Sequence, residues 1–292
     1  MNIAIFGKRL DHSDQDIFRQ FISTLENSDA EFSIYEPFYT GLQPYDFFSG
    51  TPALFSSYQD IRTNTDVMIS VGGDGTLLDS ITLIRDSSIP VLGLNLGRLG
   101  FLSSISQEDI ISSVQNLVSN NYTTETRSLL NVTSTHNLFG ELNFGLNDLT
   151  IHKHDTHNLI TVDVFINTVF LNSYWADGLI IATPTGSTGY SLSCNGPIIT
   201  PDSSTFIITP IATHNLTVRP IVLPDSSQVS IKVRGREENF TASLDSRTLL
   251  FDVSEVFQIR RASFDVKLVK MPEENFFNTL RNKLNWGLDM RN

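Results

Sequence analysis

The first hundred residues alternate between short apolar runs and segments in which apolar residues recur every three or four positions. The apolar runs predict buried strands at residues 3–6, 32–35, 66–71 and 89–94. Helical spacing predicts helices that begin near Ser13, directly after the glycine-rich turn at 72–76, and at 110. Residues 37–62 combine aromatic residues with proline and glycine, so only an irregular connection or a short helix is expected there. This alternation is typical of a doubly wound α/β domain, which binds ligands at the carboxyl ends of its strands.

The pattern changes near residue 125. Short segments separated by turn residues then predict strands at 159–166, 178–183, 205–209, 229–233, 240–244 and 264–268. The last part of the chain returns to helical spacing, with Phe276, Phe277, Leu280 and Leu284 on one face. The sequence therefore predicts an α/β domain followed by an all-β domain.

The glycine-rich turn is the densest chemical signal in the first domain. It joins a buried strand to a helix N-terminus, where backbone N–H groups close on a phosphate and the helix dipole favours negative charge. The residues expected to bind phosphate are Gly72, Gly73, Gly75 and Thr76. A bare anion site would not carry a carboxylate such as Asp74, so we expect Asp74 to act on a hydroxyl or on a metal ion carried by the phosphates. The turn thus predicts phosphoryl transfer.

A second dense segment runs from Asp177 to Tyr190. A buried strand carries a carboxylate at its start and a run of hydroxyls and glycines at its end. Asp177 can accept hydrogen bonds from a ribose hydroxyl or an adenine amine, while Thr188 and Tyr190 can frame a purine. The run Gly186-Ser187-Thr188-Gly189 lacks the G-x-S-x-G spacing of a serine hydrolase. The segment therefore favours a nucleotide pocket.

Charge and composition narrow the partners and the location. The chain has 292 residues, of which 40% are hydrophobic, and a net charge of −12, which disfavours nucleic acid and anionic membranes. Phosphate binding remains compatible with this charge if backbone amides and Mg²⁺ carry the phosphate charge. We see no secretion signal and no apolar run of membrane-spanning length. The single cysteine, Cys194, forms no internal disulfide, so a reducing cytoplasm is expected.

Taken together, these segments resemble NAD kinases, which phosphorylate the 2′-hydroxyl of NAD's adenosine ribose to make NADP. Besides the glycine turn, the resemblance rests on residues 95–102, 146–148, 177–197, 214–220, 276–280 and 283–287. It covers nearly the whole chain, and the run at 183–193 is its most specific part. It implies an α/β nucleotide domain over 1–124, a β-sandwich NAD-binding domain over 125–269, and a tail, 270–292, that returns to the first domain.

The resemblance also implies roles for individual residues. Asp74 matches the family's general base and metal-linked carboxylate. Asn147 and Asp148 match an Asn-Glu pair that binds the NAD ribose, and Asp177 matches an aspartate near the adenine and nicotinamide ends of NAD. His157 lies where some members contact their ligand. The remaining expected NAD-binding positions are Gly75, Thr188, Gly189, Tyr190, Ser191, Leu192, Ser193 and Arg247.

The chain departs from the family pattern at several positions, among them residues 194–196, where Cys194-Asn195-Gly196 replaces a common Ala-Gly-Gly. Asp148 is one methylene shorter than the usual glutamate, and Gly189 replaces the usual alanine, which implies a slightly roomier or more mobile pocket. Trp175 stands where some members carry a basic residue, and Arg247 where many carry glutamine. Because these two positions bear on cofactor preference and on feedback, the resemblance transfers neither property.

The resemblance further implies the partners. The expected substrates are NAD and ATP, and Mg²⁺ is expected to arrive with ATP, without a site fixed by the protein alone; Asp74 is its candidate contact. No tightly bound organic cofactor is expected. Family members are homodimers or homotetramers in which a neighbouring subunit completes the NAD site. Four properties stay open: whether the phosphoryl donor is ATP or polyphosphate, whether the acceptor is NAD or NADH, whether the oligomer is a dimer or a tetramer, and whether NADP inhibits the enzyme.

On the residues alone, plainer interpretations also stay open. Asp74 fits a helix cap, Asp177 a turn before a strand, and the pair Asn147–Asp148 an Asx turn. The rival enzyme is a lipid or sugar kinase, although a lipid kinase requires a basic or amphipathic surface for membranes. A non-catalytic protein that senses NAD or NADP is the other rival. A dehydrogenase is disfavoured because the turn does not give G-x-G-x-x-G.

Three histidines near one strand end raise the question of a metal site. His152, His154 and His157 alternate along the chain, but no cysteine or carboxylate next to them completes a zinc set. Solvated side chains are therefore the preferred interpretation.

Overall fold

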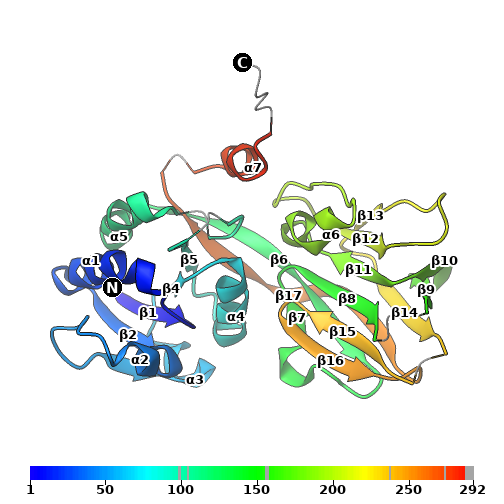
Figure 1. Cartoon of the computed structure of the whole chain (residues 1–292), viewed down its shortest axis with the longest axis horizontal. Helices are drawn as coiled ribbons and strands as arrows, with labels where there is room; N and C mark the ends of the chain where they lie inside the picture. The colour runs from blue at the N-terminus through cyan, green and yellow to red at the C-terminus, as the bar shows by residue number, and fades with distance from the viewer. Residues whose placement is uncertain (98–99, 104, 155–157, 237, 273, 287–292) are drawn as a thin grey trace. The chain divides into compact units, whose positions relative to one another are not determined.

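A computed structural model describes residues 1–97, 100–103, 105–154, 158–236, 238–272 and 274–286 of the chain. The chain divides into two compact units (Figure 1). The first consists of residues 1–126 with the described part of 266–292, and the second of residues 127–265. Strand β6 (Thr123–Ser134) begins in the first unit and β17 (Val256–Lys270) ends there. The chain therefore leaves the first unit within β6 and returns to it within β17.

A parallel sheet forms the centre of the first unit. Its strands run in the order β5-β4-β1-β2-β3, and the end of β17 joins β5 in parallel through Leu268 and Val91. The bounds are β1 Asn2–Gly7, β2 Glu31–Tyr35, β3 Ala53–Phe55, β4 Val67–Val71 and β5 Val91–Leu94. Every residue of β4 and β5 is buried, as expected for strands covered on both faces. The predicted doubly wound α/β fold is confirmed.

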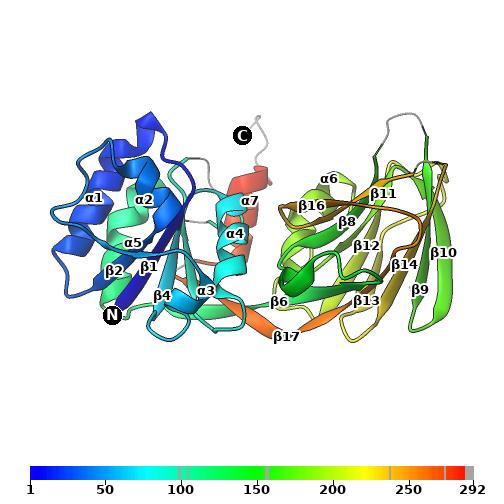
Figure 2. The same cartoon turned by 90° about the horizontal axis from the view of Figure 1, so that it is seen from below.

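Helices cover this sheet, and α1 packs beside α5 while α3 packs beside α4 (Figure 2). Their bounds are α1 Gln15–Glu26, α2 Glu36–Leu42, α3 Tyr58–Ile61, α4 Asp74–Ile84, α5 Ile110–Val118 and α7 Phe276–Leu284. Helix α1 buries Phe18, Phe21, Ile22 and Leu25, a face with the 3–4 spacing of an amphipathic helix. Short 3₁₀ turns at His12–Asp14 and Gln107–Asp109 precede α1 and α5.

The segment 37–62 is more regular than its composition indicates. It contains most of α2, strand β3 and helix α3. Strand β3 has only three residues and pairs with β2 at the end of the sheet, so no periodicity long enough to recognise was present. Helix α3 is equally short and begins with a capping box between Ser57 and Asp60.

The second unit is a β-sandwich. One sheet has the order β13-β12-β11-β8-β15-β16, and the other contains β10-β9-β14-β17 with β6 and β7. Alternate residues of both sheets form one core, for example Ile151 and Ile181 from the first sheet with Val162 and Ile231 from the second. The predicted C-terminal β-sandwich is therefore confirmed.

Turns and short helical segments connect the strands of the sandwich. The strand bounds are β7 Phe144–Gly145, β8 Asp148–Lys153, β9 Ile160–Ile166, β10 Val169–Ala176, β11 Gly178–Ala182, β12 Thr205–Ile211, β13 Ile221–Pro224, β14 Val229–Arg234, β15 Phe240–Leu244 and β16 Arg247–Phe251. A 3₁₀ turn, Thr185–Thr188, and helix α6, Tyr190–Ser193, follow β11; a further 3₁₀ turn spans Gly140–Leu142.

The tail belongs to the first unit, as predicted. Val269 and Met271 lie in its hydrophobic core, and the Asn275 side chain caps α7 by accepting the N–H of Asn278 at 2.9 Å. Across the described part of the chain, no helix combines the length and the hydropathy that crossing a bilayer requires.

Candidate active site

The glycine turn lies between β4 and α4, as the sequence predicts. Gly72 has a φ of +142°, and its N–H donates to the Leu94 carbonyl at 2.9 Å. A Cβ at this position would lie 2.5 Å from Thr76 Oγ1, so only glycine fits. Gly73 and Gly75 are exposed, and a Cβ on either would meet nothing within 4 Å. The start of α4 is therefore exposed and uncrowded at these two glycines, and a helix N-terminus of this kind is a place where a phosphate can approach.

Asp74, the first residue of α4, uses its carboxylate to hold the loop that follows β5. Its Oδ2 accepts the N–H of Phe101 at 2.9 Å, and its Oδ1 accepts those of Leu102 and Ser103 at 3.0 and 2.9 Å. Gly100 makes this approach possible, because a Cβ there would overlap the Asp74 carboxylate. A carboxylate has about four acceptor sites, so about one remains for a further donor.

In the second unit, the half-buried Asp245 organises the pair Asn147 and Asp148. Asp245 accepts the backbone N–H groups of Leu146, Asn147 and Asp148 at 2.8, 2.8 and 3.1 Å. Its own N–H donates to the Asp148 carbonyl at 3.0 Å. Sequence reasoning missed this role, because Asp245 lies in a two-residue turn between β15 and β16, where aspartate is common for local reasons.

The environment of Asp148 disfavours its charge. Its side chain is buried, and this burial, reinforced by the negative charge of Asp245, raises the pKa of Asp148 from 3.8 to about 7. The hydrogen bond from Thr150 Oγ1 to Asp148 Oδ1, at 3.0 Å, opposes the shift. Burial also raises the pKa of Asp245, against the effect of the three N–H donors and of the Arg247 charge. Perturbed carboxyl groups of this kind are typical of functional sites.

Arg247 is the first residue of β16, directly after the turn that contains Asp245. Its guanidinium donates to the carbonyls of Leu142 and Phe144, and it lies over the Phe144 ring with 5.8 Å between Cζ and the ring centroid. These contacts fix the segment that leads into Asn147. A direct contact of Arg247 with NAD stays a prediction.

The run at 183–193 packs directly against Asn147. The Thr183 N–H donates to the Asn147 carbonyl at 2.9 Å, and a Cβ on Gly186 would overlap that same carbonyl. A Cβ on Gly189 would lie 3.6 Å from Asn147 Nδ2 and 3.9 Å from Asp148 Oδ2. Gly189 therefore faces the side chains of the pair, and an alanine there would narrow this space by one methyl group. The two motifs thus meet within one unit.

The other predicted residues of this run differ in exposure. Tyr190 is 43% exposed and shares a hydrogen bond with the Cys194 thiol; burial is the largest cause of the raised pKa of both groups. Ser191 is buried and bonds to Thr209 at 2.8 Å, so its hydroxyl supports the fold. Thr188 donates to the Thr185 carbonyl, Leu192 is half-buried and Ser193 is exposed.

Asp177 forms an ion pair that the sequence did not indicate. Lys153 Nζ lies 2.5 Å from Asp177 Oδ1, with side chains 13% and 27% exposed. The Lys153 N–H also donates to the Asp177 carbonyl at 2.9 Å, which anchors the start of β11 to the end of β8. The charge of Asp177 reaches Tyr190 and contributes to its raised pKa. Asp177 is thus beside the run at 183–193.

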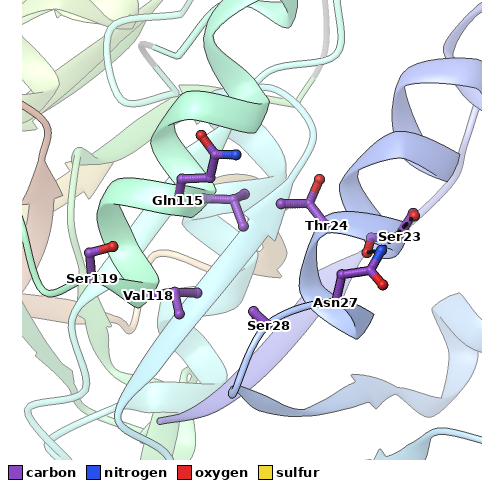
Figure 3. Close-up of a pocket in the computed structure, with 8 residues that line it drawn as sticks. Ser23, Thr24, Asn27, Ser28, Gln115, Val118 and Ser119 are labelled. Carbon is purple, nitrogen blue, oxygen red and sulfur yellow. Dashed lines mark hydrogen bonds between the residues drawn. The ribbon is translucent and has the colours of Figure 1, made fainter.

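Two hollows lie in the separate units. One, of about 550 Å³, adjoins α6 in the second unit and is lined by Ser193, Cys194, Asn195, Ile211, Leu216 and Arg219 among others. The other, of about 370 Å³, lies between the C-terminal ends of α1 and α5 (Figure 3). Hydroxyl and amide groups dominate its lining, and it includes none of the predicted site residues.

The structure describes two of the three histidines considered as metal ligands, His152 and His154. Among the described residues, no group of three or more His, Cys, Asp or Glu side chains is placed to hold a metal ion. The His152 ring bonds to the Lys153 carbonyl at 2.7 Å. His157 lies outside the described residues.

Comparison with known proteins agrees with this geometry. Family models of the ATP-NAD kinase N-terminal and C-terminal domains match residues 57–122 and 146–271. NAD kinases of Flavobacterium psychrophilum and Cytophaga hutchinsonii are 44% and 42% identical to this chain, over 100% of both chains in each case. Yeast NADH kinase complexed with NADH superposes with a TM-score of 0.87 at 27% identity, covering 100% of this chain and 89% of that one.

A doubly wound domain with a glycine turn, joined to a β-sandwich and matched in this way, defines an ATP-dependent phosphotransferase that acts on an alcohol group. Within this class, the chain belongs to the NAD kinase family. An NAD kinase from Archaeoglobus fulgidus in complex with ATP shares the fold, with a TM-score of 0.72 at 24% identity over 98% of this chain and 99% of that one.

Proposed function

We propose that this protein transfers the γ-phosphoryl group of ATP to the 2′-hydroxyl of the adenosine ribose of NAD, giving NADP. Membership of the NAD kinase family supports the reaction class. The open glycine turn supports a phosphate position at α4, and the yeast relative, which carries NADH, supports a dinucleotide substrate.

The first unit supplies the phosphate cradle and the base. The N–H groups of the turn bind the ATP phosphates, and the helix dipole adds to their attraction. Asp74 accepts the proton of the 2′-hydroxyl on the acceptor site that the three loop amides leave unused. Mg²⁺ would arrive on the ATP phosphates, where it neutralises charge that develops during transfer. Asp74 is the carboxylate of this chain that would contact it.

The second unit supplies the dinucleotide pocket. Asn147 and Asp148 bind ribose hydroxyls, and Asn147 Oδ1 is a buried oxygen without a hydrogen-bond partner among the described residues. An acceptor in this state is suited to a hydroxyl donated by a ligand. Asp177, Thr188, Tyr190 and Ser193 complete the pocket around the adenine and its ribose.

The observation that carries the proposal is the fixed carboxylate of Asp74 beside an open helix N-terminus. Its test is the formation of NADP from NAD, ATP and Mg²⁺ by the purified protein and by Asp74→Asn. Positioned general bases contribute about 10²–10⁴-fold, so we expect Asp74→Asn to lose activity in that range. The matched control is Asp79→Asn. Asp79 lies further along α4, and its carboxylate pairs with Lys8. Circular dichroism checks that each variant is folded.

Two outcomes would overturn the proposal. NADP formation near the wild-type rate in Asp74→Asn would remove Asp74 from the chemistry. No NADP from the wild type, with ATP or with polyphosphate as donor, would favour a protein that only binds NAD. The same assay with NADH in place of NAD, and with EDTA added, measures acceptor preference and the requirement for a divalent ion.

Assembly belongs to the proposal as well. We propose a homodimer or homotetramer in which a second copy completes the NAD pocket. Sedimentation of the purified protein measures the number of copies, and a monomer with full activity would contradict it.

A further inference from the structure

Asp245 is a carboxylate that the predicted site leaves without a role. It is half-buried, lies in the two-residue turn between β15 and β16, and has a φ of +52°. It contacts none of the expected reacting atoms. It is nevertheless the common acceptor for three consecutive N–H groups, those of Leu146, Asn147 and Asp148, at 2.8–3.1 Å.

The contacts between Asp245 and the pair run in both directions. While the Asp245 carboxylate receives the amides, its own N–H donates to the Asp148 carbonyl at 3.0 Å. Asp148 then continues into β8, which pairs with β15 from Leu149 opposite Leu244 onward. The conformation of the pair is therefore set by Asp245 on one side and by the sheet on the other.

The charge of Asp245 also acts on Asp148. Among the groups that face Asp148, Thr150 donates a hydrogen bond to its carboxyl group, and the thiol of Cys194 and the hydroxyl of Tyr190 lie close enough to sense its charge. Asp245 is the acidic neighbour that most strongly raises the pKa of Asp148, after burial itself. The charge of Arg247 lowers the pKa of Asp245 and so favours the ionised form of Asp245.

We propose that Asp245 is the positioning residue of the NAD site: it holds the backbone of Asn147 and Asp148 in the binding conformation, and its charge acts on the carboxyl group through which Asp148 accepts a ribose hydroxyl. The proposal rests on the proposed function, because it takes Asp148 as a ribose ligand. A carboxylate accepts two ribose hydroxyls, whereas the protonated acid gives up one acceptor site. NAD binding should therefore strengthen as pH rises through the titration of Asp148.

The test is the KM for NAD at saturating ATP and Mg²⁺, measured between pH 5.5 and 8.5. With a midpoint near pH 7, the ionised fraction of Asp148 rises about tenfold from pH 6 to pH 8, so KM should fall about tenfold. Asp148→Asn should raise KM at pH 8 and make it independent of this titration. Asp245→Asn should raise KM at pH 8 roughly tenfold through lost positioning. It should also move the midpoint to lower pH, because the neighbouring charge is gone.

The control is Asp252→Asn. Asp252 is another turn carboxylate of the second unit; it accepts the Ser254 N–H at 2.8 Å, and its variant should keep the wild-type midpoint. Ionisation of ATP is common to all four proteins and cancels in the comparison. A merely structural role of Asp245 would raise KM without moving the midpoint.

The results distinguish a failure of the proposed NAD site from a failure of the inference about Asp245. If Asp148→Asn leaves KM for NAD unchanged at pH 8, the assignment of Asp148 to the ribose, and with it the proposed NAD site, is wrong. If Asp148→Asn raises KM but Asp245→Asn keeps the wild-type midpoint, the inference about Asp245 is wrong and the site stands. If Asp245→Asn does not fold, the wild type alone decides: a KM without an inflection between pH 6 and 8 overturns the inference.

Discussion

Replacing Asp148 by asparagine should stabilise the protein at pH 8 much more than at pH 5. The side chain is buried, and the pKa of its carboxyl group in the fold is about 7, against an ordinary value of 3.8 for an exposed aspartate. Between these two values the folded state binds a proton that the unfolded state has released. Stability of the wild type therefore falls as pH rises from about 4 to about 7 and is level above that. Asparagine has the same shape and no charge to desolvate.

The magnitude follows from the same values. One pH unit corresponds to about 1.4 kcal/mol, so the ionised carboxylate costs the fold about 4 kcal/mol above pH 7. At pH 5 only the first part of this cost is present. The gain from Asp148→Asn at pH 8 should exceed the gain at pH 5 by about 3 kcal/mol. This difference isolates the ionisation, because a change in packing or hydrogen bonding would contribute equally at both pH values.

Urea unfolding followed by tryptophan fluorescence measures this difference. The chain has two tryptophans, and Trp175 lies in the second unit, whereas Trp286 follows α7 in the tail. A Trp286→Phe background therefore reports on the unit that contains Asp148. The control is Asp252→Asn, because hydrogen bonds from Ser254 lower the pKa of Asp252 and its replacement should bring no gain that grows with pH. Equal gains from Asp148→Asn at pH 5 and pH 8 would refute the reasoning.

Two further substitutions test the contacts around the site. Gly100→Ala should lower the free energy of unfolding by about 1–3 kcal/mol and reduce kcat at least tenfold, because its Cβ would overlap the Asp74 carboxylate. The control for stability is Gly97→Ala, whose Cβ would lie 3.8 Å from the nearest atom. Urea titration measures the free energy of unfolding and the NADP assay measures kcat; an unaltered urea unfolding curve in Gly100→Ala would contradict the contact. Lys153→Gln should raise the KM for NAD severalfold because it leaves the Asp177 carboxylate without its ion pair. A KM within twofold of the wild type would show that this ion pair does not position Asp177.

The fold could be predicted from the sequence where the pattern was long and the burial uniform. Strand β4 is buried at every position and α1 buries one clear face, so both were recognisable from apolar spacing. Strand β3, with three residues at the end of the sheet, carries no such pattern. Strand β10 was not predicted for a different reason. Its apolar residues Val169, Phe170 and Trp175 are exposed, so they do not mark a buried face.

The local geometry of the glycine turn could be predicted, because a strand, three glycines and a helix follow one another in the sequence. The partners of Asp74 could not be predicted, since Phe101, Leu102 and Ser103 are 27–29 residues away and meet it only through the close approach at Gly100. The ion pair between Lys153 and Asp177 could not be predicted either, because the register of β8 against β11 determines their contact.

Asp74 and Asp245 show how an acidic chain can build sites for an anionic substrate. Each lies at the edge of a strand, in a turn or at a helix start, and each accepts three backbone N–H groups from a neighbouring loop. Backbone amides hold both carboxylates in place without adding positive side chains to an acidic chain. Both residues are half-buried. In the proposed mechanism Asp74 keeps an acceptor site for a ligand, whereas Asp245 acts on the backbone and the carboxyl group of Asp148. The same local arrangement would then serve a reacting group in one unit and a positioning group in the other.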